Sequence, residues 1–415
     1  MKLPKVIIVV LVFSVAGSIF LSAGEKPKHA FLQVCYFVSQ KYYKVDQELI
    51  EWERFCKDVG SSIPLFISEE EMVKALRQVM SYLPVSHLDI YSPSEEKRAW
   101  KGIGTDTGLR VQLVEDYFVV TQILEGSPLV GKIKKGDVIY KIGEDYVQHS
   151  EEVGPARQTL TVLRLKPGLS KKQDFVRDDF DSFLVEPSQS EISVDPANKV
   201  YSYKNLTVLQ LGSFKPEMYK QEDWMNLVNQ FIDKPKLVVD LRGNLGGDFA
   251  ALLRGLSPFF CKPTLIGYIK APRRPAMEPM VFPDTLVSEK QFEILEVAKE
   301  VMLSTFENYG CFRGELSVLV DHNTGSSAEI FAQAILEKGT GRVWGQPTKG
   351  EVVLSIWYDL SFILGKGYSI SIPEASYVTT RGLDLERVGV LPEKELYYEL
   401  KHELFGRDSW LEALR

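Results

Sequence analysis

The pattern of apolar positions predicts helices at the start of the chain. Between residues 25 and 98, apolar residues recur at helical spacing, as in DQELIEWERFCKDV and SEEEMVKALRQVMSYL. In the second stretch Ser68 is followed three residues later by Glu71, which is the pattern of a capping box at a helix start. We therefore expect an N-terminal helical segment over residues 25–98.

The pattern changes to short strands and glycine turns between residues 99 and 166. KGIGTDTGLRVQLVEDYFVVTQILEGSPLVGKIKKGDVIYKIGEDYV contains several strand-like runs, separated by the turn sequences EGSP and KKGD. This pattern predicts a β-rich module. Residues 167–200 are polar and rich in Ser, Asp, Lys and Pro, and we interpret them as a linker.

From residue 201 to residue 415 strands alternate with helices. KLVVD leads through LRGNLGG into DFAALLRGL, and LSVLVD leads through NTG into SSAEIFAQAILEKG. A strand, a tight loop and a helix, repeated in this order, predict an α/β core with a largely parallel sheet.

The first residues have the pattern of an export signal. MKLPK supplies two lysines, an uncharged apolar run extends from Val6 to Ala23, and small residues follow. These features predict a secretory signal peptide over residues 1–24, and hence a periplasmic or secreted protein. The run is 18 residues long, so an uncleaved membrane anchor remains an alternative.

Composition narrows the class of protein. Apolar residues make up 45% of the chain and charged residues 25%, which is typical of a folded globular protein. A net charge of -7 and the lack of a dense basic run argue against nucleic acid as a partner. The four cysteines allow two disulfides in three pairings, or four free thiols. Their spacing matches no zinc site, and we expect neither a metal nor an organic cofactor.

Two loops carry candidate chemistry. In the first, DLRGNLGG, Gly246 and Gly247 could place an amide where negative charge develops during acyl transfer, or could simply form a tight turn. In the second, Ser326 could be a nucleophile with the Ser327 amide as a second oxyanion donor, or could be a helix N-cap. Because each loop joins a strand to a helix, parallel strands would place both at one edge of the sheet.

A serine nucleophile needs a base, and the chain contains five histidines. His29 follows the leader, His149 lies in a polar loop, and His402 lies in a charged C-terminal stretch. His322 lies four residues before Ser326, which makes a productive contact difficult. His87, in PVSHLDIYS, lies in a loop that could reach a cleft, although it could equally be a surface histidine.

Together these motifs resemble the C-terminal processing peptidases, also called tail-specific proteases, and their tricorn-core relatives. The resemblance rests on DLRGNLGG, TGSSAEI and GQPTKG, and it covers nearly all of the mature chain. It implies a crotonase/Clp-protease-like α/β core and a PDZ-like module over residues 99–166. It also implies that Gly102, Ile103 and Gly104 belong to the loop that binds the carboxylate of a peptide. Counting back from Glu329 in the serine turn assigns the nucleophile to Ser326.

The chain departs from the Ser–Lys dyad of typical processing peptidases. The family's lysine lies 25 residues after the serine, where this chain has Glu351. Lys349 lies two residues earlier, about 6.6 Å away along an extended chain, and is the alternative base.

The tricorn-like branch instead uses a histidine base oriented by a glutamate, which the resemblance places on His87 and Glu386. Val85 stands where that branch has an aspartate, and Asp384 is an alternative to Glu386. In this assignment Gly246 or Gly247 and Ser327 form the oxyanion hole.

We therefore expect an exported serine endopeptidase that acts on proteins or peptides, with the PDZ-like module binding substrate. A catalytically inactive peptide-binding protein on the same fold is the main alternative, and a small-ligand carrier is another. Self-cleavage within residues 167–200 and assembly into a homodimer remain open.

Overall fold

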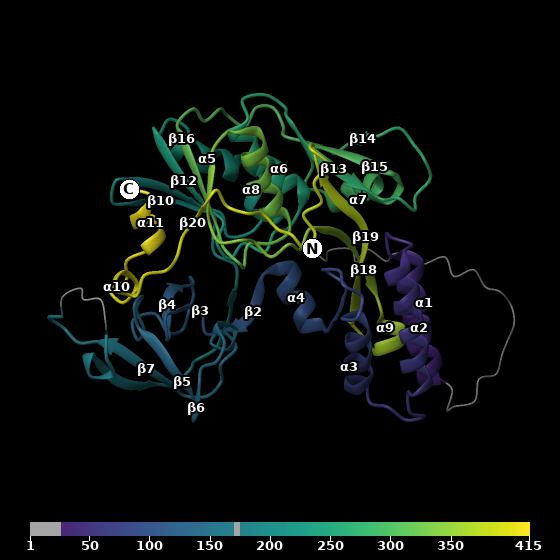
Figure 1. The fold of residues 1–415 in the computed structure, drawn as a ribbon, viewed down its shortest axis with the longest axis horizontal. Coiled ribbons are helices and arrows are strands. Elements are labelled where there is room, and N and C mark those ends of the chain that lie inside the picture. The colour runs from purple at the N-terminus through teal and green to yellow at the C-terminus, as the bar shows by residue number, and fades with distance from the viewer. Residues whose placement is uncertain (1–25, 170–174) are drawn as a thin grey trace, which may run out of the picture.

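The computed structural model describes residues 26–169 and 175–415, which form three lobes (Figure 1). Residues of all three lobes line one cleft. The α/β core is at the top of Figure 1, the β-rich module lies below it on one side, and the N-terminal helices lie below it on the other. The predicted signal peptide lies outside the described residues. No helix within the described ranges is long and apolar enough to cross a membrane.

The N-terminal lobe packs three helices, followed by a short strand and a fourth helix: α1 (Lys26–Lys41), α2 (Gln47–Ser61), α3 (Glu69–Met80), β1 (Asp89–Tyr91) and α4 (Pro93–Lys101). Ser68 caps α3 in the predicted capping box with Glu71. Trp52 is fully buried and donates from its indole nitrogen to the Val79 carbonyl at 2.8 Å, which joins α2 to α3. A disulfide between Cys35 and Cys56 joins α1 to α2.

The β-rich module is an antiparallel sheet with an apolar cluster on each of its two faces. Its strands follow the order β3-β4-β5-β7-β8, with β6 paired to β5. The strands are β3 (Leu109–Val114), β4 (Tyr117–Ile123), β5 (Val138–Ile142), β6 (Asp145–Tyr146), β7 (Leu160–Leu165) and β8 (Phe180–Val185), with the short 3₁₀ turns η1 (Ser150–Glu152) and η2 (Arg177–Asp179). No α-helix lies between β3 and β8 among the described residues.

The prediction of a linker over residues 167–200 is wrong for its second half. β8 (Phe180–Val185) pairs with β7 and completes the sheet of the module. β9 (Ser190–Ser193) pairs with β2 (Ile103–Asp106) in a two-stranded ribbon. One face of each strand is exposed and carries polar residues. The composition of residues 167–200 is therefore like that of a linker, although part of the segment forms strands.

The core sheet confirms the predicted α/β architecture. Its order is β10-β11-β12-β16-β17-β20, with every neighbouring pair parallel except β10 and β11. The strands are β10 (Lys199–Tyr203), β11 (Leu206–Gln210), β12 (Lys236–Asp240), β16 (Glu315–Val320), β17 (Arg342–Gly345) and β20 (Lys394–Glu395). The accompanying helices are α5 (Gln221–Phe231), α6 (Phe249–Leu256) and α8 (Ser327–Lys338), with the 3₁₀ turns η3 (Pro216–Tyr219) and η4 (Ser257–Phe259).

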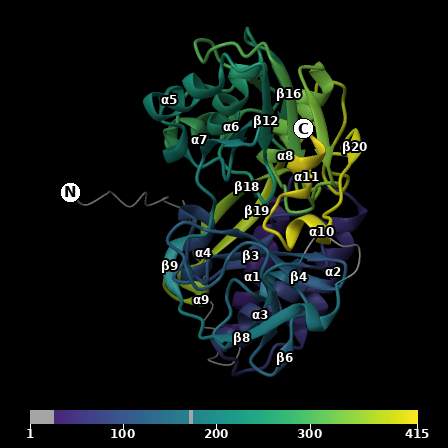
Figure 2. The ribbon, with the colours of Figure 1, turned by 90° about the vertical axis from the view of Figure 1, so that its left-hand side faces the viewer.

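A second sheet, which the sequence pattern did not predict, connects the core to the N-terminal lobe. Its order is β1-β19-β13-β15-β14, and β18 pairs with the other side of β19. The strands are β13 (Leu265–Lys270), β14 (Met280–Val281), β15 (Glu300–Ser304), β18 (Val353–Asp359) and β19 (Ser369–Thr379), with helices α7 (Ser288–Val297) and α9 (Ser361–Leu364). In Figure 2, β18 and β19 run from the core towards α4 and α9. A second disulfide, between Cys261 and Cys311, joins two loops of the core.

The C-terminal segment fixes the module to the core. It contains α10 (Leu400–Glu403) and α11 (Ser409–Ala413). Leu400 and Leu404 pack into the apolar cluster on one face of the module's sheet. Gly136, in the turn before β5, lies so close that a Cβ there would be 2.6 Å from the Leu404 carbonyl oxygen. The module is therefore packed against the core through this segment.

Candidate active site

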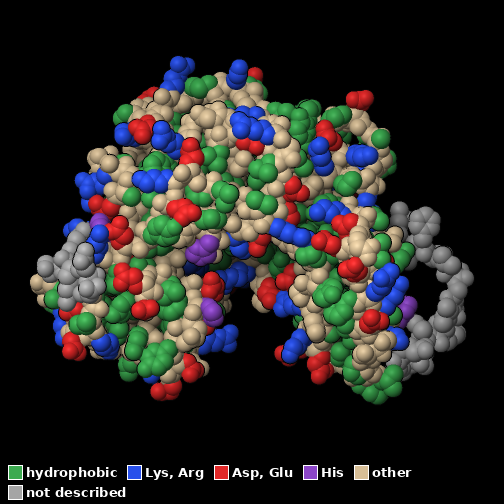
Figure 3. All heavy atoms as spheres, in the orientation of Figure 1, with side chains coloured by type: hydrophobic (Ala, Val, Ile, Leu, Met, Phe, Trp, Pro, Cys, Tyr) green, Lys and Arg blue, Asp and Glu red, His purple; other side chains and the backbone are tan. Residues whose placement is uncertain are grey.

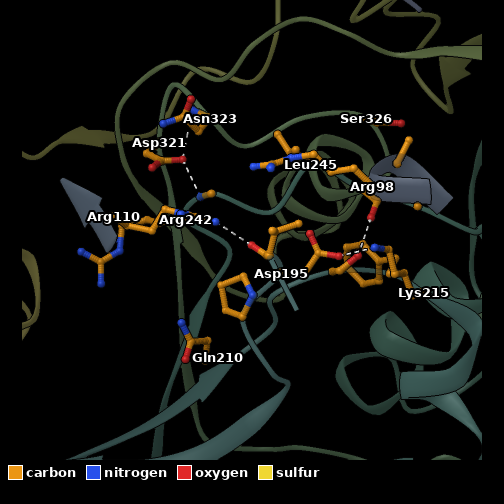
Figure 4. Close-up of a pocket in the computed structure, with 18 of the residues that line it drawn as sticks. Arg98, Arg110, Asp195, Gln210, Lys215, Arg242, Leu245, Asp321, Asn323 and Ser326 are labelled. Carbon is orange, nitrogen blue, oxygen red and sulfur yellow. Dashed lines mark hydrogen bonds and ion pairs between the residues drawn. The ribbon is translucent and has the colours of Figure 1, made fainter. Parts of the chain in front are cut away.

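Ser326 lies in a strained turn where β16 runs into α8. Its φ angle is 54°, a conformation that residues other than glycine adopt rarely and at a cost in free energy. Ser326 precedes α8, but its side chain forms no hydrogen bond with the first turn of the helix. The Glu329 amide donates to the Ser326 carbonyl oxygen instead, at 2.8 Å. The hydroxyl of Ser326 is therefore not used as a cap, and this serine lines the cleft (Figure 4).

Glu329 holds the serine turn against a second loop, residues 348–351. Its carboxylate is fully buried and accepts hydrogen bonds from the Ser326 amide (2.8 Å), the Thr348 hydroxyl (2.5 Å), and the Gly350 and Glu351 amides (2.7 and 3.0 Å). Burial raises the pKa of this carboxyl, although all four hydrogen bonds act to lower it. Glu329 is thus a structural residue of the turn.

The two glycines of DLRGNLGG lie directly against the serine turn, as predicted for loops at one sheet edge. A Cβ on Gly246 would lie 2.6 Å from Ser326 Cβ and 2.8 Å from the Ser327 amide nitrogen. Gly246 also has a φ angle of 94°, so both its conformation and its surroundings require glycine. The Ser327 hydroxyl donates to the Gly247 carbonyl oxygen at 2.7 Å and joins the two loops.

The amides of Gly246 and Gly247 differ in whether they already donate a hydrogen bond. The Gly246 amide donates to the side-chain oxygen of Asn244 at 2.8 Å, and Asn244 is fully buried. The Gly247 amide and the Ser327 amide have no hydrogen-bond partner among the described residues. Two unpaired N–H groups therefore lie in the loops that meet at Ser326. The sequence could not distinguish the glycines, because the role of Asn244 depends on the folded loop.

His87 lines the same cleft as Ser326. Its backbone φ is 59°, and its Nε2 lies 3.2 Å from the Glu351 carbonyl oxygen. A carbonyl oxygen can only accept a hydrogen bond, so Nε2 carries the proton in this contact and the other ring nitrogen carries a lone pair. That tautomer leaves one nitrogen able to act as a base.

Glu386 contacts the residue next to His87. Its carboxylate accepts hydrogen bonds from the amide and the hydroxyl of Ser86, at 2.8 and 3.0 Å, and from the Val352 amide at 2.8 Å. Ser86 was not among the predicted site residues, although its position beside His87 in PVSHLD was the available signal. Asp384, the alternative acid, is exposed and accepts from the Glu386 amide at 3.0 Å.

The alternative base, Lys349, lies beside the serine turn. Its ammonium forms an ion pair with Glu351 at 3.0 Å, and its Cδ is 3.3 Å from where a Cβ on Gly325 would be. Lys349 is not among the residues that line the cleft.

The predicted peptide-binding residues of the module do not form a loop. Gly102 ends α4 with a φ of 57°, and Ile103 and Gly104 lie in β2, paired with β9. The Gly102 carbonyl oxygen accepts from the Val194 amide at 2.7 Å. Because these backbone groups are used within the ribbon, the expected local structure of a carboxylate-binding loop is wrong.

The cleft has a volume of about 2000 Å³ and is lined by all three lobes. Figure 3 shows the molecule hollowed on this face between the module and the N-terminal helices. The cleft contains Ser326, His87, Gly246 and Gly247 together. No group of three or more His, Cys, Asp or Glu side chains could hold a metal ion within the ranges that the structure describes.

Residues 205–396 match the model of Peptidase family S41. This part of the chain is therefore similar to S41 peptidases. The predicted resemblance to C-terminal processing peptidases is confirmed: the chloroplastic C-terminal processing peptidase of Tetradesmus obliquus is 32% identical over 81 residues, 20% of this chain and 17% of that protein. The nisin-resistance protein of Lactococcus lactis subsp. lactis is 29% identical over 131 residues, 31% of this chain and 38% of that protein. Each match therefore spans well under half of the curated relative.

Solved structures show the same fold over most of the chain. A photosystem II D1 C-terminal processing protease is 19% identical with a TM-score of 0.53, and the alignment covers 89% of this chain and 93% of that one. Mature CPAF in complex with lactacystin is 11% identical with a TM-score of 0.58, covering 94% and 97%. At these identities the likeness confirms the predicted fold class of the α/β core and its helical lobe, but not the PDZ-like character of the module.

Proposed function

We propose that this chain is a serine endopeptidase that hydrolyses peptide bonds of protein substrates with Ser326 as the nucleophile. The observation that carries the proposal is the serine turn itself. Ser326 has a strained backbone at the positive end of α8, its hydroxyl is not used as a cap, and two unpaired amides lie in the adjoining loops. Oxyanion stabilisation of acyl transfer needs such donors, fixed before the reaction begins.

In this proposal His87 is the general base. It takes the proton of the Ser326 hydroxyl as the oxygen attacks the scissile carbonyl carbon, and returns the proton to the leaving amine. The Ser327 and Gly247 amides stabilise the negative charge on the carbonyl oxygen. We assign the second oxyanion donor to Gly247 rather than to Gly246, because the Gly246 amide already donates to Asn244.

Glu386 acts as a positioning residue through Ser86 in this proposal. Its carboxylate holds both the amide and the hydroxyl of Ser86, and so fixes the backbone that carries His87. It also holds the Val352 amide, next to the Glu351 carbonyl oxygen that the imidazole contacts. Glu386 thus supports both sides of the histidine.

The Ser326–Lys349 dyad remains the alternative mechanism. Lys349 is close to the serine turn, but its amine is occupied by the ion pair with Glu351. A catalytically inactive peptide-binding protein is the alternative function, and the His87 contact with the Glu351 carbonyl oxygen rather than with Ser326 is the observation in its favour. On either alternative the module and the cleft would still bind peptides.

Export is part of the proposal. The predicted signal peptide places the mature chain outside the cytoplasm, and the two disulfides, Cys35–Cys56 and Cys261–Cys311, fit an oxidising compartment. The module would contribute to substrate binding, because its strand β3 and the turn before β5 line the same cleft as Ser326.

The test is hydrolysis of casein, an unfolded protein, by the purified mature chain beside Ser326→Ala. We expect turnover by the natural chain and none by the variant, with the same circular dichroism spectrum for both. Ser327→Ala is the matched control, because it removes the neighbouring hydroxyl but keeps the amide. Turnover that persists in Ser326→Ala would contradict the proposal.

A further inference from the structure

β18 is an edge strand that borders the cleft. It pairs along its length with one side of β19, from Val353 opposite Ser376 to Asp359 opposite Ser369. β1 and β13 pair with the other side of β19, and no other described strand pairs with β18. Residues 353–357 line the cleft, so a row of unpaired backbone N–H and C=O groups faces the space that contains Ser326.

Pro373 determines which backbone groups of β18 point outwards. It opposes Ser355, has no N–H, and its carbonyl oxygen accepts from the Tyr43 amide at 3.0 Å rather than from β18. Ser355 and Pro373 are therefore a non-hydrogen-bonded pair of the antiparallel ladder. Because the two kinds of pair alternate, Trp357 opposite Ser371 is a second such pair. Ser355 and Trp357 thus direct their N–H and C=O groups to the open edge.

Three aromatic side chains lie beside this edge, and we call them the aromatic shelf: Tyr91 of β1, Trp100 of α4 and Trp357 of β18. The Trp357 ring centroid lies 4.1 Å from that of Tyr91 and 5.2 Å from that of Trp100. All three line the cleft, and Trp100 is 57% exposed. Exposed aromatic surface gathered inside a cleft is typical of a binding site for an apolar group.

β18 is continuous with the loop that surrounds the candidate catalytic residues. The preceding residues Gly350 and Glu351 donate to Glu329, and Val352 donates to Glu386. The Ser355 hydroxyl donates to the His87 carbonyl oxygen at 3.4 Å. A polypeptide paired with β18 would therefore run directly towards the serine turn and His87.

We propose that β18 binds an extended segment of the substrate as an added strand, and that the aromatic shelf binds an apolar side chain of that segment. This inference rests on the proposed peptidase function and names its substrate class. Strand addition takes affinity from main-chain hydrogen bonds and specificity from alternate side chains. The substrates are consequently unfolded or frayed polypeptides with a large apolar residue at one fixed distance from the scissile bond. Substrate segments in helices or in paired strands cannot bind in this way, because their backbone N–H and C=O groups already form hydrogen bonds.

Backbone N-methylation of a cleaved casein-derived peptide tests the added strand. Each amide outside the scissile bond is methylated in turn, and kcat/KM is measured. We expect losses of about five- to tenfold at alternate positions on one side of the scissile bond, which is the cost of one hydrogen bond each. Losses that show no alternation, or no loss at any position, would overturn the proposal.

Two pairs of variants test the enzyme side. Ser355→Pro removes both the outward N–H and the hydroxyl that donates to His87, whereas Ser355→Ala removes only the hydroxyl. We therefore expect kcat/KM of the proline variant to be about five- to tenfold below that of the alanine variant. Trp100→Ala should lower kcat/KM for peptides with an aromatic residue at the position that the aromatic shelf binds. It should not lower kcat/KM for peptides with serine at that position. Phe66→Ala is the matched control, because Phe66 is 90% exposed and lies outside the cleft. Equal loss on both peptide series would overturn the role of the shelf.

Binding separates failure of this inference from failure of the proposed function. Affinity of the same peptides for Ser326→Ala is measured by fluorescence polarisation, which needs no hydrolysis. If the natural chain hydrolyses no casein, the peptides are made from a casein segment that binds Ser326→Ala. An alternating N-methyl pattern in their affinity then means that the strand site stands and the peptidase proposal falls. If hydrolysis occurs but neither kcat/KM nor binding alternates, the peptidase proposal stands and the strand site falls.

Discussion

At the scale of single residues, the site depends on backbone positions that tolerate few side chains. Ser326 and His87 both have positive φ angles, Gly246 lies against Ser326, and Gly246 and Gly247 have φ angles of 94° and 140°. Ser326 and the glycine pair could be predicted, because a motif with a physical role identifies each of them. The occupied Gly246 amide could not be predicted, because it depends on where the buried side chain of Asn244 points after folding.

Gly246→Ala should abolish most activity while leaving the fold intact. The added Cβ would lie 2.6 Å from Ser326 Cβ, so the side chain of Ser326, the proposed nucleophile, has to move, and we expect kcat to fall by about a hundredfold or more. Gly243→Ala is the matched control in the same loop: its φ is also positive, at 72°, but a Cβ there meets nothing within 4 Å. Both variants should lose about 1–2 kcal/mol of stability in urea unfolding. Equal activity in the two variants would show that Gly246 does not position the serine.

Ser86→Ala tests whether Glu386 acts through its neighbour. The hydroxyl that meets Glu386 at 3.0 Å is lost while the amide contact at 2.8 Å remains, so the loop keeps its place but His87 is held less firmly. We expect kcat to fall by about tenfold with KM unchanged, and Ser86→Thr to restore it. The pH dependence of kcat/KM should also shift on its acidic limb. A purely structural serine would change thermal stability without moving that limb.

At the scale of elements, prediction succeeded where the pattern is local. The helices of the N-terminal lobe and the parallel strands of the core follow from apolar periodicity and capping residues. β1 (Asp89–Tyr91) was missed because three residues carry no period, and its partner, residues 369–371, lies far along the chain. β8 and β9 were missed because strand formation there depends on pairing with β7 and β2, which sequence separation hides.

α10, which joins the module to the core, carries a carboxyl that should respond to pH. Glu403 is buried, and burial raises its pKa from 4.5 to about 7, although the Ser409 amide and hydroxyl donate to it. Since the folded pKa is raised, the folded state favours the protonated acid. Its contribution to stability is complete below the unfolded pKa near 4.5 and is lost as pH rises through 7.

Urea unfolding at pH 5 and pH 8 checks this contribution. From pH 5 to pH 8 the free energy of unfolding of the natural chain should fall by about 2–3 kcal/mol more than that of Glu403→Gln, because the amide does not titrate. Glu399→Gln is the control on the same segment, because the Glu399 side chain is more exposed. Curves that run parallel for the natural chain and Glu403→Gln would show that the buried acid does not titrate in this range.

At the scale of the whole molecule, three lobes place their residues around one cleft. The N-terminal lobe supplies His87, the core supplies Ser326 and Gly247, and the module supplies a wall through β3. Glu386 of the core accepts from Ser86, the neighbour of His87. The sequence predicted these lobes and most of these residues. It did not show that the module is packed against the C-terminal segment, because that contact joins parts of the chain that local patterns do not relate.

Reaction with a fluorophosphonate probe tests the central claim most directly, because the probe bonds covalently only to an activated serine. Mass spectrometry of the labelled natural chain should find one probe, attached to Ser326. Labelling should be lost in His87→Ala and retained in Lys349→Ala. Full labelling of His87→Ala, or attachment of the probe to another serine, would contradict the assignment of Ser326 and His87 as nucleophile and base.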